Sequence, residues 1–420
     1  MYNQSQSIIL NVADKVLKGD VTLPSSKSIC NRVLIIQSIC NNTFNISNIS
    51  NADDSQLLVT LLDSIHNQAN DTTPKIINTK NAGTVFRFLT AYLSICKGSY
   101  ILTGDNRMQQ RPIHALVNAL LSLGADIKYI ETHGFPPLQI GELKYKDNDI
   151  CVDANLSSQF ISALLLIAPL LPDGIKLYIK GNIVSRPYID MTLKIMQQFN
   201  VEHTWHDTII TVRKQNYLPS TANYIVEADW SAASYFYQIV AMADDATLFL
   251  KDLYKESFQG DAVVADIYKS FGVDTVFEEN GVRLTKNGFT VDKFKYDFSN
   301  CPDLVPAVAV TCAALGISSE LRGLKNLKIK ESDRLTALVI ELSKMGVETM
   351  VEEDNALWIY KSKIKIREPI QTYNDHRMAM CFAPLALLQN NIELNDPDVV
   401  VKSFPDYFNE LSKLGFEINE

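Results

Sequence analysis

A weak repeat with a period of about 70 residues runs through the chain and constrains its fold more than any other feature. Each copy is a leucine-rich stretch, then a glycine, then a short alternation of apolar and polar residues. The copies are ALLSLGADI (119–127), DIYKSFGVDT (266–275), IELSKMGVET (340–349) and NELSKLGFEI (409–418), with looser versions at 193–203 and 57–66. A period of this size indicates an architecture assembled from copies of one supersecondary unit.

The repeated unit is predicted to contain an amphipathic helix followed by a strand. Apolar residues recur at helical spacing before each break in the pattern. The break is occupied by Gly124, Asn200, Gly272, Gly346 and Gly415. Glycine suits the left-handed backbone that ends many helices, because it has no Cβ atom to clash. About six such units fit into 420 residues, three in each half, so we expect an α/β (α+β) chain of two domains.

The boundary between the two domains is expected near residues 224–229. The preceding loop, 215–223, contains proline, serine and threonine, which are typical of connections between folded elements. A predicted strand at 7–12 comes before the first complete unit and can pair with either domain.

The composition excludes several classes of protein. With 46% hydrophobic and 21% charged residues, the chain is neither disordered nor fibrous. A net charge of −9 argues against a nucleic-acid partner. The longest apolar stretch, 160–171, is too short to cross a bilayer, so no membrane partner is expected. The N-terminal residues MYNQSQSIIL lack the basic region and apolar core of a secretory signal.

The cysteines and histidines indicate a cytoplasmic protein without a metal site. Seven scattered cysteines include no CxxC pair, which favours a reducing compartment. His203 and His206 lie three residues apart, but no second pair of ligands accompanies them, so no metal is expected.

Five polar segments precede predicted helices in the first half of the chain. They are 25–28 before the helix 29–39, 81–84 before 85–95, 111–112 before a helix ending at 123, 157–159 before 160–170, and 185–188 before a helix ending at 199. For any one segment alone, helix capping is the simpler explanation. Lys27 is different, because the interaction of a cation in the first turn with the helix dipole is unfavourable by about 0.3–1 kcal/mol. Helix N-termini with added cations are typical sites for phosphate or carboxylate.

Four charged segments follow in the second half. They are CPD (301–303), KIKESDR (328–334), YNDHR (373–377) and KSFPDY (402–407). If a helix starts at Glu331, Lys330 and Arg334 lie on one face. The simpler explanations are solvated clusters of ion pairs and, for Asp303, an N-cap of the apolar helix predicted at 304–315.

Many cations and few histidines suggest a ligand with several anionic groups, because arginine and lysine bind phosphate and carboxylate. The sequence has no GxxxxGK[ST] loop, no GxGxxG after a strand and no GxSxG elbow. These absences argue against an NTPase, a dinucleotide-dependent enzyme and a common serine hydrolase.

Taken together, the motifs resemble those of the EPSP synthase family, 3-phosphoshikimate 1-carboxyvinyltransferase. The resemblance runs nearly end to end. Its motifs are LPSSKSICNR (23–32), NAGTVFRFLTA (81–91), RMQQRPI (107–113), SSQF (157–160), SRPYIDMTL (185–193), CPDLVPA (301–307), IKESDRL (329–335), YNDHRMAM (373–380) and KSFPDYF (402–408).

The resemblance implies the enolpyruvyl transferase fold, which resembles an α/β barrel turned inside out and has two domains of three βαβαββ units. One domain would comprise residues 1–21 and 227–420, and the other residues 22–226, with the active site in the interdomain cleft. The implied reaction transfers the enolpyruvyl group of phosphoenolpyruvate to the 5-hydroxyl of shikimate 3-phosphate, on the shikimate pathway to chorismate and aromatic amino acids. It needs no metal or cofactor, and we expect a monomer.

The resemblance also implies the site residues. Shikimate 3-phosphate would be held by Lys27, Ser28, Arg32, Ser157, Ser158, Gln159, Ser185, Tyr188, Asp303, Asn326 and Lys330. Phosphoenolpyruvate would be held by Lys27, Asn81, Gly83, Arg111, Gln159, Arg334, His376, Arg377 and Lys402. Asp303 is expected to be the base that takes the hydroxyl proton and Glu331 the acid that protonates the methylene carbon, and Lys330 can share either role.

Two rival functions fit the motifs less well. The sister enzyme acts on UDP-N-acetylglucosamine, but its active-site loop carries a cysteine, and residues 104–110 here contain none. A non-catalytic anion-binding protein would not require carboxylates such as Asp303 and Glu331 near anionic ligands. One departure from the family pattern is Lys80, where glycine is usual; it adds a cation beside the expected phosphoenolpyruvate pocket.

Overall fold

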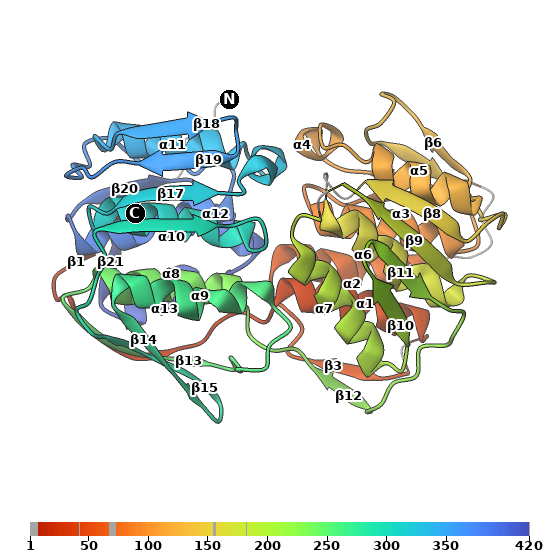
Figure 1. Cartoon of the computed structure of the whole chain (residues 1–420), viewed down its shortest axis with the longest axis horizontal. Coiled ribbons are helices and arrows are strands. Elements are labelled where there is room, and N and C mark those ends of the chain that lie inside the picture. Colours follow the sequence, from red (N-terminus) through yellow and green to blue (C-terminus); the bar gives the residue numbers. More distant parts are fainter. Residues whose placement is uncertain (1–6, 42, 67–72, 154–156, 182, 420) are drawn as a thin grey trace. The chain divides into compact units, whose positions relative to one another are not determined.

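The computed structural model describes residues 7–41, 43–66, 73–153, 157–181 and 183–419 (Figure 1). The chain divides into two compact units. Unit 1 comprises Met1–Ser26 and Glu227–Glu420, and unit 2 comprises Lys27–Val226. In the described part of the chain, no helix is both long and apolar enough to cross a membrane. Residues 1–6 of the N-terminal stretch, in which no secretory signal was expected, lie outside the described residues.

Residues 22–26 belong to unit 1 because their backbone pairs with the segment that begins at Glu227. The N–H of Ser26 donates to the carbonyl of Glu227 (2.8 Å), and the N–H of Asp229 donates to the carbonyl of Pro24 (2.9 Å). The chain therefore passes into unit 2 at the start of its first long helix rather than at Val21, which ends a strand.

Unit 2 has two four-stranded sheets and one two-stranded sheet. The strands are β3 (Asn45–Ser47), β4 (Lys75–Asn78), β5 (Tyr100–Thr103), β6 (Ile127–Tyr129), β7 (Leu138–Ile140), β8 (Asp149–Asp153), β9 (Ile175–Lys180), β10 (His203–His206), β11 (Ile209–Val212) and β12 (Asn223–Ile225). The helices are α1 (Lys27–Ile39), α2 (Asp53–His66), α3 (Gly83–Ile95), α4 (Asn106–Gln109), α5 (His114–Leu123), α6 (Ser158–Ile167) and α7 (Arg186–Gln198), with a 3₁₀ turn η1 (Ala168–Leu170).

Unit 1 has two four-stranded sheets and one three-stranded sheet. Its strands are β1 (Ser7–Val12), β2 (Val16–Val21), β13 (Asp245–Lys251), β14 (Val273–Glu278), β15 (Gly281–Lys286), β16 (Lys293–Asp297), β17 (Ser318–Arg322), β18 (Thr349–Glu352), β19 (Ala356–Ile359), β20 (Ile392–Asn395) and β21 (Phe416–Asn419). Its α-helices are α8 (Trp230–Met242), α9 (Val264–Ile267), α10 (Val305–Ala314), α11 (Arg334–Lys344), α12 (His376–Phe382) and α13 (Tyr407–Lys413). Its 3₁₀ turns are η2 (Gly260–Val263), η3 (Tyr268–Phe271), η4 (Pro302–Leu304), η5 (Lys325–Ile329), η6 (Ala383–Leu387) and η7 (Pro397–Lys402).

The four-stranded sheets share one topology, which explains the repeat. In β4-β5-β7-β6, β8-β9-β11-β10, β16-β17-β19-β18 and β2-β13-β15-β14, a parallel pair is extended by an antiparallel hairpin. Between β2 and β13 the chain passes through all of unit 2 and then α8. In the other three sheets one α-helix connects the parallel strands and further helix leads to the hairpin, as in β8-α6-β9-α7-β10-β11. This is a βαβαββ unit, so the predicted fold class is confirmed. The first strand, β1, pairs with β20 and β21 near the C-terminus.

The helices that connect parallel strands form the cores of the units. Helix α6 is apolar on nearly every face, and all its residues except Gln159 are buried. In the corresponding helix of unit 1, α10, every residue except Ala314 is buried. Helices apolar all round are stable only when enclosed, whereas the sheets keep one exposed face, as the alternating burial of β8 shows. The polar N-termini of the buried helices are therefore the places where the core meets solvent.

The predicted left-handed positions are confirmed. Positive φ angles occur at Gly124 (99°), Asn200 (60°), Gly272 (77°), Gly346 (78°) and Gly415 (95°). Each residue ends a helical segment before a return to extended backbone. The looser copy at 57–66 lies in helix α2, and the residues directly after it are outside the described part of the chain.

Two of these glycines should respond differently to the same substitution. A Cβ atom on Gly272 would lie 2.2 Å from the carbonyl oxygen of Phe289, whereas a Cβ on Gly346 would meet nothing within 4 Å. Both have nearly the same φ in the same unit, so Gly346→Ala is expected to cost only the left-handed strain of about 1–2 kcal/mol. Gly272→Ala should cost clearly more, as measured by denaturant unfolding. Equal losses would contradict this account of the backbone contact.

One helix start was predicted wrongly. Helix α11 begins at Arg334 and not at Glu331, so Lys330 and Arg334 do not share a helical face. The reason is the cap, because the Asp333 carboxylate accepts a hydrogen bond from the N–H of Thr336 (3.1 Å). Residues 330–333 form a bend before the helix.

Candidate active site

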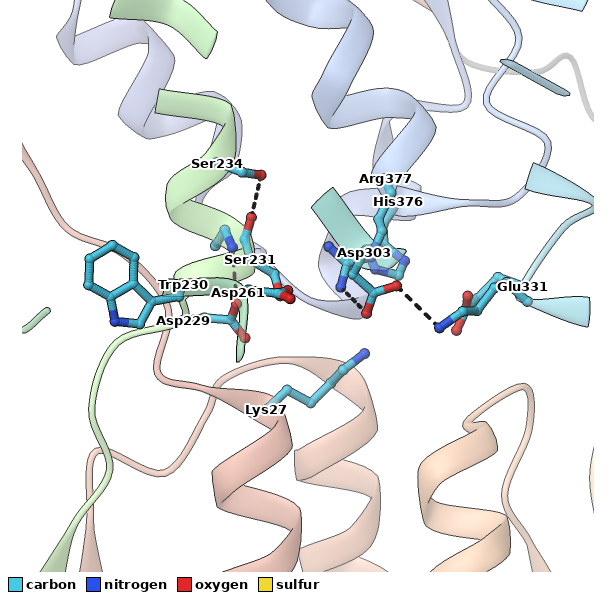
Figure 2. Close-up of polar contacts among 12 residues, drawn as sticks. Lys27, Asp229, Trp230, Ser231, Ser234, Asp261, Asp303, Glu331, His376 and Arg377 are labelled. Atoms are coloured by element: carbon cyan, nitrogen blue, oxygen red, sulfur yellow. Dashed lines mark hydrogen bonds and ion pairs between the residues drawn. The ribbon is translucent and has the colours of Figure 1, made fainter. Parts of the chain in front are cut away.

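Asp303 is the centre of a dense charged cluster in unit 1 (Figure 2). Its Oδ1 lies 3.1 Å from an Nη of Arg334 and 3.3 Å from the Nζ of Lys330. Its Oδ2 accepts a hydrogen bond from an Nη of Arg377 (2.9 Å). Residues from positions 303, 330, 334 and 377 therefore meet at one carboxylate, and we call this group the Asp303 cluster.

The backbone around Asp303 presents its side chain to this cluster. Asp303 lies in η4 directly before α10, and Pro302 occupies the first position of that turn, where its missing N–H costs nothing. The N-cap of α10 is Leu304 and no side chain caps it, so Asp303 is not the N-cap that the simpler explanation suggested. Its carboxylate is left to bind cations.

Arg334 holds the cluster together from the first position of α11. Its side chain is fully buried. It contacts Asp375 (Nε–Oδ2, 2.9 Å), Glu331 (Nη–Oε2, 2.8 Å) and Asp303. Burial alone would lower the pKa of this guanidinium, but the three carboxylates raise its pKa well above the usual range. Arg334 is thus held permanently charged by anions on three sides.

Asp375 orients two of the arginines at once. Its buried carboxylate accepts hydrogen bonds from Arg334, from the hydroxyl of Ser332 (3.0 Å) and, as N-cap of α12, from the N–H of Arg377 (3.0 Å). The sequence-based site did not include Asp375. The signal for it was its position directly before His376 and Arg377 in the YNDHR motif.

The electrostatics make Asp303 a carboxylate in the substrate-free chain. Burial would raise its pKa, but Arg377, Lys330 and Arg334 together hold the pKa well below its usual range. A carboxylate in this state is ionised but weakly basic, because the cations stabilise its charged form. Its basicity must increase if these cations are drawn to another anion.

The remaining predicted residues of unit 1 lie on neighbouring turns. Glu331 is in the bend before α11, and His376 is the buried first residue of α12. Asn326 lies half-buried in η5, and its side chain makes no hydrogen bond to the Asp303 cluster within the described residues. Lys402 lies half-buried at the end of η7.

In unit 2, Arg32 ties together the starts of three helices. It is buried, with 1% of its surface exposed. It donates to the carbonyl of Ser28 in α1 (2.7 Å), to Ser162 in α6 (3.2 Å) and to Thr192 and the carbonyl of Tyr188 in α7 (2.7 and 3.2 Å). Burial lowers its pKa to about 10. These partners are neutral, so Arg32 adds an uncompensated positive charge beneath the helix N-termini.

The side chains of two further arginines, Arg111 and Arg87, meet at the start of α3. A Cβ atom added to Gly83 would lie 2.6 Å from one Nη of Arg111 and 2.7 Å from one Nη of Arg87. Arg111 is buried, and its Nε and one Nη have no hydrogen-bond partner among the described residues. Two guanidinium groups close to one helix N-terminus form a strongly attractive place for an anion.

Arg87 was missed by the sequence-based analysis, although it lies one helical turn after Gly83. Its Nη1 donates to the Oε1 of Gln159 (2.6 Å). The Nε2 of Gln159 then donates to the hydroxyl of Thr84 (3.0 Å). Arg87 thereby orients the amide of Gln159 and joins the starts of α3 and α6.

Lys27 is the first residue of α1, and its Nζ pairs with the Asp54 carboxylate of α2 (3.0 Å). The other predicted residues of unit 2 also lie at helix starts. Ser157 caps α6 by accepting from the N–H of Gln159 (3.2 Å), and Ser158 is buried beside it. Asn81 lies in the turn before α3, and Ser185 precedes α7 with a positive φ of 57°.

The described residues contain no group of three or more histidine, cysteine, aspartate or glutamate side chains arranged to hold a metal ion. Lys80, where the family pattern usually has glycine, adopts a positive φ of 49°. Glycine adopts this backbone conformation more readily than other residues do.

Comparison with known proteins places these observations in one family. A family model described as EPSP synthase (3-phosphoshikimate 1-carboxyvinyltransferase) matches residues 13–411. A relative named 3-phosphoshikimate 1-carboxyvinyltransferase from Bacteroides fragilis is 44% identical over 411 residues, which cover 97% of each chain. A relative of the same name from Vibrio campbellii is 35% identical over 431 residues, covering 97% of this chain and 99% of that one. The fold is similar to that of EPSP synthase from Acinetobacter baumannii, with a TM-score of 0.78 at 21% identity, covering 99% and 100% of the two chains.

Proposed function

The chain belongs to the EPSP synthase family, and we propose that it transfers the enolpyruvyl group of phosphoenolpyruvate to the 5-hydroxyl of shikimate 3-phosphate, releasing phosphate. The observation that carries the proposal is the Asp303 cluster, in which a largely buried carboxylate is held by three cations. A reaction between two anionic substrates needs both parts: cations to bind the anions and a carboxylate to accept a proton.

The cluster supports a two-step addition and elimination. In the first step, the 5-oxygen bonds to C2 of phosphoenolpyruvate while its proton passes to Asp303. The methylene carbon takes a proton from Glu331, giving a tetrahedral intermediate. In the second step, the bond from C2 to the phosphate oxygen breaks, the leaving phosphate takes the proton held by Asp303, and the new methyl group returns a proton to Glu331, which gives the enol ether. Lys330, which lies 3.3 Å from Asp303, can share either transfer.

Binding of phosphoenolpyruvate would also activate the base. Arg334 and Arg377 are proposed to contact the substrate carboxylate, together with His376 and Lys402. An anion that draws these cations partly away from Asp303 removes the effect that holds its pKa low. Asp303 would then become a stronger base only when the substrate is present.

The helix starts of unit 2 are proposed to bind the phosphate groups. For shikimate 3-phosphate the proposed contacts are Lys27, Ser28, Ser157, Ser158, Gln159, Ser185 and Tyr188 from unit 2, with Asp303, Asn326 and Lys330 from unit 1. For phosphoenolpyruvate the proposed contacts in unit 2 are Lys27, Asn81, Gly83, Arg111 and Gln159. Arg32 is proposed to support this site through Ser28 and Tyr188, because neutral groups already occupy its donors.

Gly83→Ala is expected to weaken the binding of phosphoenolpyruvate. The added methyl group would press against the guanidinium groups of Arg111 and Arg87, which must move to make room. We expect KM for phosphoenolpyruvate to rise about 10–100-fold, because small displacements of positioning groups have effects of this size. KM for shikimate 3-phosphate should change much less. Inhibition by glyphosate, which competes for this pocket in the family, should weaken in parallel. Steady-state kinetics would contradict the assignment if the two KM values rose equally.

The protein is proposed to act as a cytoplasmic monomer. All seven cysteines lie within the described residues and are free thiols. Free thiols are typical of a reducing compartment. Light scattering at working concentrations would give the mass of one chain, and the mass of two would contradict the monomer.

The proposed reaction is tested by identifying its product. Incubation of the purified chain with both substrates should give a carboxyvinyl ether at the 5-position, visible by NMR as two vinyl protons, together with inorganic phosphate. A product modified at another hydroxyl would contradict the proposal. Neither rival, the UDP-N-acetylglucosamine enzyme or a non-catalytic binding protein, gains support from a feature of the site.

A further inference from the structure

A second buried carboxylate, Asp261, lies near Asp303 in unit 1 and has no part in the reaction described so far (Figure 2). Asp261 is in η2, and 2% of its surface is exposed. The hydroxyl of Ser231, in the first turn of α8, donates to its Oδ2. Its Oδ1 is buried and has no hydrogen-bond partner among the described residues.

The absence of a counter-ion distinguishes Asp261 from Asp303. Within the described residues, no lysine or arginine forms an ion pair with Asp261, whereas three cations surround Asp303. A buried carboxylate with one hydrogen bond and no paired cation is costly to ionise. The loop that carries it is well anchored, because Gln259 hydrogen-bonds to the N–H of Trp230 (3.0 Å) and the carbonyl of Ala228 (2.7 Å). Asp261 therefore cannot easily turn towards solvent.

The charged groups around Asp261 come from four elements. Asp303 precedes α10, Asp229 caps α8, Arg377 lies in α12, and the Cys301 thiol precedes η4. Burial and the negative charges of Asp303 and Asp229 raise the pKa of Asp261 to about 7, against the opposing effects of Ser231 and Arg377. The same repulsion acts in the other direction, since coupling between two sites is reciprocal. An ionised Asp261 makes Asp303 more basic.

We propose that Asp261, buried beside Asp303 with one carboxylate oxygen unpartnered, is a positioning residue that tunes the base: once ionised, it strengthens Asp303 as the acceptor of the hydroxyl proton. The inference rests on the proposed function. It explains why a carboxylate without a paired cation is buried beside Asp303, whose own basicity is reduced by the three cations around it. Ser231 supports this role, because its hydrogen bond to Asp261 favours the ionised form of that carboxylate.

The test compares kcat/KM of Asp261→Asn with that of the native chain from pH 6 to pH 8.5. The substrate phosphates also ionise near pH 6, so the measured quantity is the ratio of native to variant, in which substrate ionisation cancels. We expect the ratio to increase about three- to tenfold from pH 6 to pH 8.5, with its midpoint near pH 7. Ser231→Ala should move that midpoint to higher pH. Asp266→Asn, an exposed carboxylate on α9, is the matched control and should give a flat ratio.

Thermal unfolding without substrates gives an independent result. A carboxyl whose folded pKa is raised stabilises the fold fully below its unfolded pKa and loses that contribution as pH rises through its folded value. The native chain should therefore lose stability relative to Asp261→Asn between pH 6 and pH 8. The Tm of the native chain minus the Tm of Asp261→Asn should fall by about 2–4 °C over this range.

These outcomes separate the inference from the proposed function. A ratio of native to variant kcat/KM that is the same at every pH would show a merely structural role and overturn the inference, as would a Tm difference that does not change with pH. Failure of the native chain to release phosphate would overturn the proposed function and, with it, the part assigned to Asp261.

Discussion

Turnover is expected to fall about 10²–10⁴-fold when Asp303 is replaced by asparagine, the range for loss of an acid–base group. The amide has nearly the same shape, and its single oxygen can still accept a hydrogen bond from Arg377 or from Lys330, but it cannot take the hydroxyl proton. KM for shikimate 3-phosphate should change much less than kcat, because the cations that attract the anions remain. Steady-state kinetics of phosphate release measure both parameters.

The control for this substitution is Asp266→Asn, because Asp266 is exposed on α9, with 72% of its side chain accessible. Its kcat should match that of the native chain. If Asp303→Asn kept kcat within threefold of the native value, Asp303 would not be the base. A matching circular dichroism spectrum would show that any loss of activity is not a loss of fold.

Removal of the Asp375 carboxylate is expected to destabilise unit 1 more than any surface change. Asp375 is fully buried and accepts hydrogen bonds from Arg334, Ser332 and the backbone of Arg377. In Asp375→Ala the guanidinium of Arg334 stays buried but loses the one ion-pair partner that is itself fully buried. Breaking a buried ion pair by removing one partner costs about 3–5 kcal/mol. Denaturant unfolding should show this loss, and KM for phosphoenolpyruvate should rise because Arg334 and Arg377 lose their orientation.

Asp354→Ala is the matched control for Asp375→Ala. Asp354 pairs with Lys328 (3.0 Å), but both side chains are substantially exposed, so the pair should contribute little to stability. A loss for Asp375→Ala as small as that of the control would contradict the role assigned to the buried pair.

The fold was largely predictable because its repeat leaves local signals. Each unit needs a left-handed residue where its amphipathic helix turns into the next strand, and glycine or asparagine marks that place in the sequence, as at Gly124 and Asn200. The start of α11 was not predictable from charge spacing, because the competing cap at Asp333 decided it. Local hydrogen bonds of this kind are visible only when the backbone is placed.

The site was predictable in part, through motifs at helix starts. Lys330, Arg334 and Arg377 were expected to act together, and the structure brings them to Asp303. Arg87, Asp375 and Asp261 were missed for one shared reason: their partners are distant in sequence, at Gln159, Arg334 and Ser231. A buried polar side chain acquires its role from such partners, and sequence spacing does not encode them.

Initial-rate phosphate release with phosphoenolpyruvate tests the central claim most directly, with shikimate 3-phosphate or UDP-N-acetylglucosamine as the acceptor. We expect catalytic release that depends on shikimate 3-phosphate, persists in EDTA and is lost in Asp303→Asn. A folded chain that releases phosphate only with UDP-N-acetylglucosamine, or with neither acceptor, would contradict the account.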